Sequence, residues 1–523
     1  MNESTPRAGR REWLGLAVIA LPCMLYSMDL TVLNLALPSI SEDLKPSGTQ
    51  LLWIVDIYGF MVAGLVITMG TLGDRIGRRR LLMFGAAAFG VTSVLAAFST
   101  SPEMLIAARA LLGAAGATLA PSTLSLIRNM FLDARQRRVA ISVWVTSYSV
   151  GAAVGPPLGG VLLEFFWWGS VFLLAVPVMV LLLVVGPRLL PEFRDPEARK
   201  PDVISAALSV AAVLVLIYGM KQIAEHGWSA TAAGLIMAGL AFGAIFVRRQ
   251  LTLADPLIDL RLFKVPAFSA SLSTYLVATL VAFGSFVFIA QYLQLVEGLS
   301  PLEAGLWTMP FAGAFIVGSM LTPPITRHVR PAFVMGSGLL VAAAGFAMLA
   351  RVDMSTGLAL LVAAFVVFSL GLAPVFTLAT DLVVGTAPPE RAGAAAAISE
   401  TSSEFGGALG IAVLGSIGTA VYRSEMADSV PGGLDLESTE AAESTLGGAV
   451  SVAESLPEPL GSELLSAAQN AFTQSLETAA IVSAVLAFLT AIAVAVVLRN
   501  LEIGGPEVEP ELTREQRNEP EPA

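Results

Sequence analysis

Long apolar stretches, each about the length of a membrane-spanning helix, recur along the chain between residues 14 and 499. A helix of roughly 20 apolar residues crosses a hydrocarbon layer about 30 Å thick. The stretches lack the alternation of barrel strands, and in lipid only helices and closed barrels satisfy the backbone. We therefore predict an all-α polytopic membrane protein with fourteen transmembrane helices, at 14–38, 51–72, 81–99, 104–126, 140–162, 169–190, 203–221, 231–247, 268–296, 303–322, 333–350, 357–384, 393–420 and 477–499.

Composition agrees with this pattern and excludes a water-soluble enzyme. Of the 523 residues, 14% are charged and 55% are hydrophobic, and the mean hydropathy is +0.76. Ordinary soluble proteins contain roughly 25% charged residues. One cysteine and two histidines are too few for a disulfide or a histidine–cysteine metal site. The chain also lacks a G-x-x-x-x-G-K-[ST] phosphate loop, and we expect no enzyme activity, no cofactor, no metal and no nucleic-acid partner.

Positive charges indicate the orientation of these helices. Of the 30 Lys and Arg residues, 25 fall in segments on the side of the N-terminus, and only Lys45, Lys221, Arg351 and Arg423 fall in loops on the other side. Arg109 is the one positive charge expected inside a helix. Because cytoplasmic loops of membrane proteins collect Lys and Arg, we expect both termini to be cytoplasmic.

The net charge of −11 is concentrated in two segments that depart from membrane composition. Residues 423–476 are acidic and rich in Ser, Gly and Ala, and we expect them outside the cell as a partly ordered loop in which segments such as 462–476 form short amphipathic helices. The tail, 500–523, is rich in Pro and Glu and is expected to be disordered.

Four motifs occur in order along the first five helices. They are Asp29 to Pro38 on the first helix, a loop with Gly73, Asp74, Gly77 and Arg78, Arg109 on the fourth helix, and Gly151, Gly155, Pro156, Gly159 and Gly160 on the fifth. Together they resemble the major facilitator superfamily, and the helix count and the Asp29 segment resemble its fourteen-helix drug:proton antiporters, especially exporters of quaternary ammonium compounds. The resemblance extends over residues 12–500.

The resemblance implies the major facilitator fold. After a cytoplasmic N-terminus, 1–13, it implies a six-helix bundle at 14–190, two inserted transmembrane helices at 203–247 and a second six-helix bundle at 268–499. It also gives roles to the motifs. Asp74 with the arginines after it would form a cytoplasmic latch, and the glycines of the fifth helix lie on nearly one face and would allow close packing.

Two aspartates lie inside the predicted helices. Asp29 lies nine residues before Pro38, about 14 Å deep, and Asp56 lies about 8 Å deep in the second helix. A carboxylate within a span costs roughly 2.5–3.5 kcal/mol and is more often functional than not. The resemblance assigns the pair to substrate and proton coupling. The alternatives are a helix–helix hydrogen bond for Asp29 and a solvated vestibule acid for Asp56.

Further candidates lie on later helices. Glu400 and Glu404 share a helix face, with Glu404 close to the membrane midplane. For Glu400 snorkelling or a loop salt bridge is the alternative. The resemblance assigns Arg109 to proton transfer or to balancing a nearby acid such as Asp29, and a purely structural ion pair is its alternative. Asp381 is a weaker candidate near the inner end of its helix. Tyr58, Trp144 and Tyr148 could offer ring faces to a cation, although packing is their alternative role.

These observations, with the resemblance, predict a proton-coupled multidrug antiporter of the bacterial plasma membrane that acts as a monomer and moves hydrophobic and mainly cationic compounds outward. The proton gradient would drive it. One alternative is an exporter of a neutral or anionic metabolite such as an amino acid, siderophore or lipid. A second is a non-transporting receptor or scaffold that uses the acidic loop to bind a partner.

Overall fold

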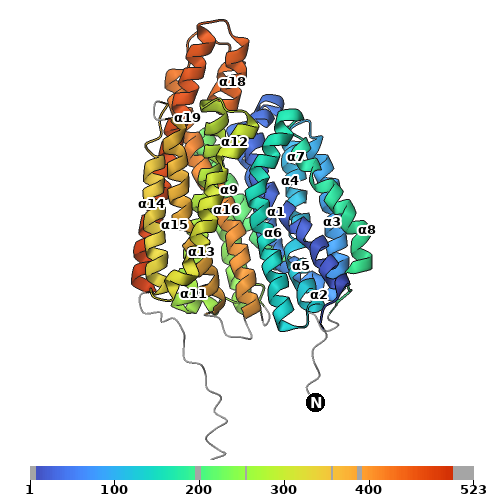
Figure 1. Ribbon diagram of the computed structural model, residues 1–523. Helices are drawn as coiled ribbons and strands as arrows, with labels where there is room; N and C mark the ends of the chain where they lie inside the picture. The colour runs from blue at the N-terminus through green and yellow to red at the C-terminus, as the bar shows by residue number, and fades with distance from the viewer. Residues whose placement is uncertain (1–6, 195–201, 254–255, 355–356, 386–391, 499–523) are drawn as a thin grey trace, which may run out of the picture.

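A computed structural model describes residues 7–194, 202–253, 256–354, 357–385 and 392–498. Within these ranges the chain is helical and contains no strand (Figure 1). Fourteen helical spans are long and apolar enough to cross a membrane, which confirms the predicted number. The predicted disordered tail, 500–523, lies outside the described residues.

The helices form two sets, each with its own apolar core, joined by a helical hairpin. The N-terminal bundle consists of α1 (Arg10–Leu44), α2 (Gly48–Ile76), α3 (Arg78–Ala97), α4 (Pro102–Gly116), α5 (Leu119–Met130), α6 (Ala134–Phe165), α7 (Ser170–Leu173) and α8 (Ala175–Leu189). The hairpin is α9 (Val203–His226) and α10 (Ala230–Thr252). The C-terminal bundle consists of α11 (Pro266–Gln291), α12 (Pro301–Trp307), α13 (Met309–Thr326), α14 (Pro331–Leu349), α15 (Gly357–Gly385), α16 (Ala392–Ser429), α17 (Leu436–Ser444), α18 (Leu446–Ser455) and α19 (Leu460–Val497), with short turns η1 (Leu262–Lys264) and η2 (Tyr292–Val296).

The two ends of the molecule differ. In Figure 1, α18 and the beginning of α19 project from one end, which we call the cap end. The chain enters α1 at the opposite end, which we call the terminal end. Three predicted spans are divided by breaks, so that α4 and α5, α7 and α8, and α12 and α13 each cross as a pair.

Several helices extend beyond their predicted ends. The first runs through Pro38 to Leu44, and α16 and α19 reach Ser429 and Leu460. The expectation of short helices within 423–476 is confirmed by α17 and α18. The segment 462–476 is also helical, but the expectation of a separate short helix there was wrong, because 460–476 forms the first turns of α19. Its apolar residues, such as Leu464, are buried against the neighbouring short helices, so tertiary contacts continue the helix past the apolar run.

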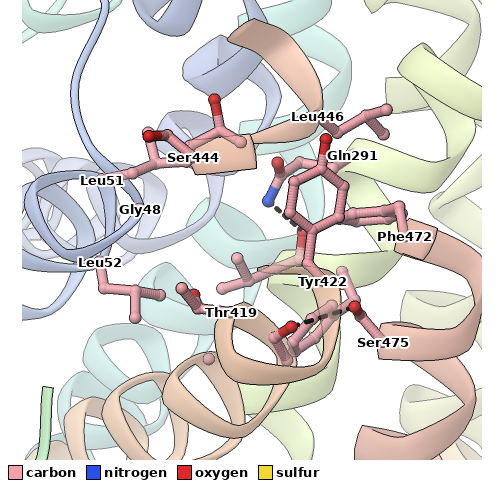
Figure 2. Close-up of a pocket in the computed structure, with 15 residues that line it drawn as sticks. Gly48, Leu51, Leu52, Gln291, Thr419, Tyr422, Ser444, Leu446, Phe472 and Ser475 are labelled. Carbon is pink, nitrogen blue, oxygen red and sulfur yellow. Dashed lines mark hydrogen bonds between the residues drawn. The ribbon is translucent and has the colours of Figure 1, made fainter. Parts of the chain in front are cut away.

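The short helices α17 and α18 close the cap end over both bundles. Tyr422 of α16 donates a hydrogen bond of 2.9 Å to the carbonyl of Ala442 and thereby holds α17. Figure 2 shows that side chains of α2, α11, α16 and α19 converge beneath these helices. The cavity they leave is only about 50 Å³, so this end of the molecule is filled by side chains.

Contacts between the bundles run from the cap end to the middle of the helices. The Gln294 side chain donates a hydrogen bond of 3.0 Å to the carbonyl of Leu35 across the boundary. Further along, α2 packs on α16, and α6 packs on α12. We call these two helix contacts the bundle seam. At Gly160, an added Cβ would lie 2.6 Å from the Pro301 carbonyl oxygen, so the seam brings backbone against backbone.

The α9–α10 hairpin lies on this seam. α9 contacts both α2 and α16. At its terminal end, Asp202 caps α9 by accepting hydrogen bonds from Ser205 and pairs with Arg249 at 3.0 Å. Burial acts to raise the pKa of Asp202, but the hydrogen bonds from Ser205 and the Arg249 charge outweigh it and lower that pKa. The hairpin is therefore held together by a charged clamp at one end.

Candidate functional site

Asp29 and Arg109 form a buried ion pair within the N-terminal bundle. The Arg109 guanidinium lies 2.5 Å from Asp29 Oδ2 and is 1% exposed. Its Nε also donates to the Ile54 carbonyl at 3.1 Å, and its Cζ lies 4.7 Å from the centre of the Tyr58 ring. Because α1 continues to Leu44, Asp29 lies about 22 Å from that helix end rather than the expected 14 Å.

Asp56 pairs with a lysine that the sequence analysis misplaced. Lys221 was expected in a loop, and Arg109 was expected to be the only positive charge inside a helix. Both expectations were wrong, because α9 continues to His226 and Lys221 lies within it. Its Nζ is 2.6 Å from Asp56 Oδ2, and both side chains are 0% exposed. The carboxylate compensates a charge that the apolar surroundings would otherwise exclude.

Sequence-predicted residues from both bundles meet at one small cavity. Asp56 and Arg109 line it from the N-terminal bundle, and Glu404 lines it from α16. The cavity is about 30 Å³, enough for one or two waters. Through Arg109, Asp29 joins the same cluster. Asp56 lies eight residues from the beginning of α2, so the rise of the helix places it about 12 Å below the cap end of α2.

The two glutamates of α16 differ from the aspartates in having no counter-charge. Among the described residues, no cation lies within salt-bridge distance of Glu400 or Glu404. Glu404 instead interacts with the Tyr26 hydroxyl of the opposite bundle. Glu400, one turn closer to the terminal end, lies within electrostatic range of Tyr148. Among the described residues, these two acids therefore differ from Asp29 and Asp56 in lacking a compensating cation.

An aromatic column extends from the cluster toward the terminal end. Ring centres of Tyr58 and Tyr26 are 5.9 Å apart, those of Tyr26 and Tyr148 are 5.8 Å apart, and those of Tyr148 and Trp144 are 4.9 Å apart. Trp144 also donates a hydrogen bond of 3.0 Å to Thr123. The sequence analysis missed Tyr26, although its spacing of three residues from Asp29 places both on one helix face.

Asp381 does not join the cluster. Its side chain is exposed near the terminal end of α15. Asp381 is not among the described residues that line the cavity, and α15 packs mainly on α14, α13 and α11, with a smaller contact on α16.

The loop motif between α2 and α3 forms a compact charged turn. Asp74 accepts a hydrogen bond of 2.8 Å from Arg78 Nε, so its partner lies within the motif. Gly77 adopts φ +115°, a backbone conformation that side chains with a Cβ disfavour. An added Cβ at Gly73 would lie 3.1 Å from Arg78 and Leu81. Glu192, after α8, accepts a hydrogen bond from the Arg79 backbone N–H and ties the turn to the bundle.

The glycines of α6 face two different neighbours. Gly151, Gly155 and Gly159 pack against α1 within the N-terminal bundle, and at Gly159 an added Cβ would lie 2.6 Å from Val32. Gly160 instead faces the C-terminal bundle, so the expectation of a single common face was wrong for it. Pro156 also reaches across, because its carbonyl oxygen would lie 2.5 Å from a Cβ at Gly305.

Comparison with known proteins decides the family. A family model described as "Major Facilitator Superfamily" matches residues 19–411. The chain belongs to the Major Facilitator Superfamily. The family membership predicted from the motifs is thus confirmed, and with it the classification as a multi-pass transporter. Within the described residues, no group of three or more His, Cys, Asp or Glu side chains is arranged to hold a metal ion.

Full-length relatives agree with this assignment. The chain is 46% identical to "Multidrug efflux pump LfrA" of Mycolicibacterium smegmatis, covering 95% of this chain and 98% of that protein. It is 35% identical to "Methyl viologen resistance protein SmvA" of Salmonella typhimurium, over 89% and 94% of the two chains. In fold it is similar to the crystal structure of a bacterial homolog of the human lysosomal transporter Spinster in an inward-facing, unoccupied conformation, with TM-score 0.64 and 18% identity, covering 95% of this chain and 100% of that one.

Proposed function

We propose that this transporter is a proton-coupled exporter of hydrophobic, mainly cationic drugs, with its terminal end in the cytosol of a bacterium and its cap end outside. The names of the relatives, which refer to multidrug efflux and to methyl viologen resistance, support the substrate class. The excess of Lys and Arg in the segments at the terminal end supports the orientation. The protein works as a monomer and uses no cofactor.

The observation that carries the proposal is that Glu404 and Glu400, at the boundary between the bundles, have no cation partner among the described residues. Arg109 and Lys221 already compensate the two aspartates. Glu404 lies twelve residues from the beginning of α16, about 18 Å from the terminal end. A charge at such depth in a span is costly unless water, a proton or a cation compensates it.

Exchange follows from competition at these carboxylates. A proton on Glu404 removes the charge that attracts a cation, so occupancy by one ligand lowers the affinity for the other. The seam is closed at the cap end, so in this proposal the acids exchange their ligands with the cytosol in this conformation. Opening the seam would release the cation outside, where protons reload the acids. The membrane potential adds about 2.3 kcal/mol per net charge moved per 100 mV.

Ethidium transport in everted membrane vesicles tests the proposal. A proton gradient, acid inside, should drive ethidium into vesicles containing the unmodified protein, and an uncoupler should abolish this uptake. Glu404→Gln should abolish it and Glu400→Gln should weaken it. Glu463→Gln, which removes an exposed acid on α19, is the matched control and should behave as wild type.

Two results would contradict the proposal. Unchanged uptake in the Glu404→Gln/Glu400→Gln double variant would remove the glutamates from the mechanism. Absence of gradient-driven ethidium movement by the wild-type protein, at normal expression, would refute the assignment to cationic drugs.

A further inference from the structure

We infer that Asp56 and Trp53 form a binding site for organic cations, that the ammonium group of Lys221 is its built-in occupant, and that Lys221 sets the affinity for cationic cargo by competing for Asp56. This inference rests on the proposed export of cations. It assigns to the inserted hairpin a role in substrate recognition.

The contacts of the lysine match those of a bound organic cation. Lys221 Nζ lies 2.6 Å from Asp56 Oδ2 and 3.9 Å from the centre of the Trp53 ring. A carboxylate combined with the face of an indole ring is the chemistry with which proteins bind ammonium ligands. Tyr218, one turn before Lys221 on α9, approaches the same tryptophan with ring centres 6.4 Å apart. The surroundings of Lys221 therefore combine an acid with two aromatic rings, groups that also suit a flat, hydrophobic cation.

Lys221 binds only one of the two carboxylate oxygens of Asp56. Asp56 Oδ1 is buried and has no hydrogen-bond partner in the structure. Asp56 also borders the small cavity that Arg109 and Glu404 line. A buried carboxylate oxygen without a donor is unfavourable, and a ligand that brings a positive charge to this cavity would satisfy it.

The pair lies where the transporter must change shape. Ile217, one turn before Lys221, packs with Phe60 of α2 and with Ala408 and Ala412 of α16. α9 thus touches both bundles at the seam, and rocking of the bundles must alter at least one of these contacts. The ion pair keeps α9 with α2, so the contact with α16 is the one that changes and exposes the Asp56 site.

The charges around Asp56 determine the expected selectivity. Arg109 on α4 carries one positive charge, which Asp29 already compensates, and Glu404 on α16 is an acid with no cation partner among the described residues. Removing the Lys221 charge would leave two uncompensated acids, Asp56 and Glu404, at one cavity. The binding of a dication should then improve more than the binding of a monocation.

Equilibrium binding to the purified full-length protein in lipid nanodiscs tests the inference, with ethidium as monocation and methyl viologen as dication. Lys221→Met should tighten ethidium binding about tenfold, in the range of typical coupling between ligands at linked sites, and should tighten methyl viologen binding more. Asp56→Asn/Lys221→Met should lose this gain because the carboxylate is gone. Lys221→Arg, which keeps the charge and can bind Asp56 with two hydrogen bonds, should weaken ethidium binding several-fold.

A lysine that only fastens α9 to α2 gives a different result. Variants that fold would then bind both cations with wild-type affinity, which would overturn the inference. If Lys221→Met does not fold, Lys221→Arg still tests the inference, because arginine retains the buried ion pair with Asp56. Unchanged ethidium affinity in Lys221→Arg would refute competition between residue 221 and the cation. Failure of the proposed function would give a different result from failure of this inference, because the wild-type protein itself would then bind no ethidium.

Discussion

Replacing Gly160 with alanine should shift the protein away from the conformation that is closed at the cap end. In the structure, a Cβ at this position would lie 2.6 Å from the Pro301 carbonyl oxygen and 2.7 Å from Leu302 Cα. Both atoms belong to the opposite bundle, and ordinary contacts begin at about 3.4 Å. The bundles must separate by nearly 1 Å to admit the methyl group.

The cost of this clash can be estimated. Inserting a methyl group into a tightly packed interface costs about 1–3 kcal/mol when the surroundings cannot yield, and backbone atoms yield poorly. Only the closed conformation contains the clash, so the equilibrium should shift toward the open one by a factor of roughly 5–150. Transport should slow because the inward-facing state becomes sparsely populated.

Distance measurements between spin labels at Glu42 and Glu463, exposed positions at the cap end of the two bundles, report this shift. The one native cysteine, Cys23, is buried, so labelling can be confined to the two introduced cysteines. Gly160→Ala should add a population with a longer distance. Gly234→Ala, at a glycine with open space around it, is the control. An unchanged distance distribution in folded Gly160→Ala would show that the contact of α6 with α12 does not close the transporter.

Three further predictions concern stability. Arg109→Met leaves Asp29 buried without its partner, which should cost about 3–5 kcal/mol and lower the unfolding temperature, whereas Asp29→Asn/Arg109→Met should recover most of this loss. Gly77→Ala places a side chain at φ +115° against Glu192 and should destabilise the protein by about 1–2 kcal/mol. Equal unfolding temperatures for Gly77→Ala and wild type would show that an alanine at this position causes no backbone strain. The lowered pKa of Asp202 means that its charged form stabilises the hairpin at pH values above the ordinary value of 3.8, and that this contribution disappears as the pH falls through the lowered pKa. The protection of amides at the beginning of α9, taken as the exchange rate relative to the intrinsic rate at each pH, should therefore fall in acid for the wild-type protein and should already be low at neutral pH in Asp202→Asn. Equal protection of the two proteins at neutral pH would contradict this account.

The sequence predicted some features of the fold and the site correctly and did not predict others. The apolar runs predicted the membrane spans because lipid requires a continuous apolar helix wherever the chain crosses. Those runs do not mark where a helix ends once it leaves the membrane, so the extensions of α1, α16 and α19 were missed. The same limitation placed Lys221 in a loop, since the predicted span ended at that residue and the helix continues to His226.

The sequence alone determined the number of spans, the family motifs and the acids that lie within helices, because each of these depends on residue type and local spacing in a low-dielectric solvent. Only the tertiary structure decided which charges compensate one another. Asp56 and Lys221 are 165 residues apart in the chain, and no local pattern links them. A buried charge is stable only beside its partner, and that partner is chosen by how α9 packs on α2. Among the described residues Glu404 has no cation partner, and this too is decided by the tertiary structure, because it depends on how far the packed bundles keep each cation from Glu404.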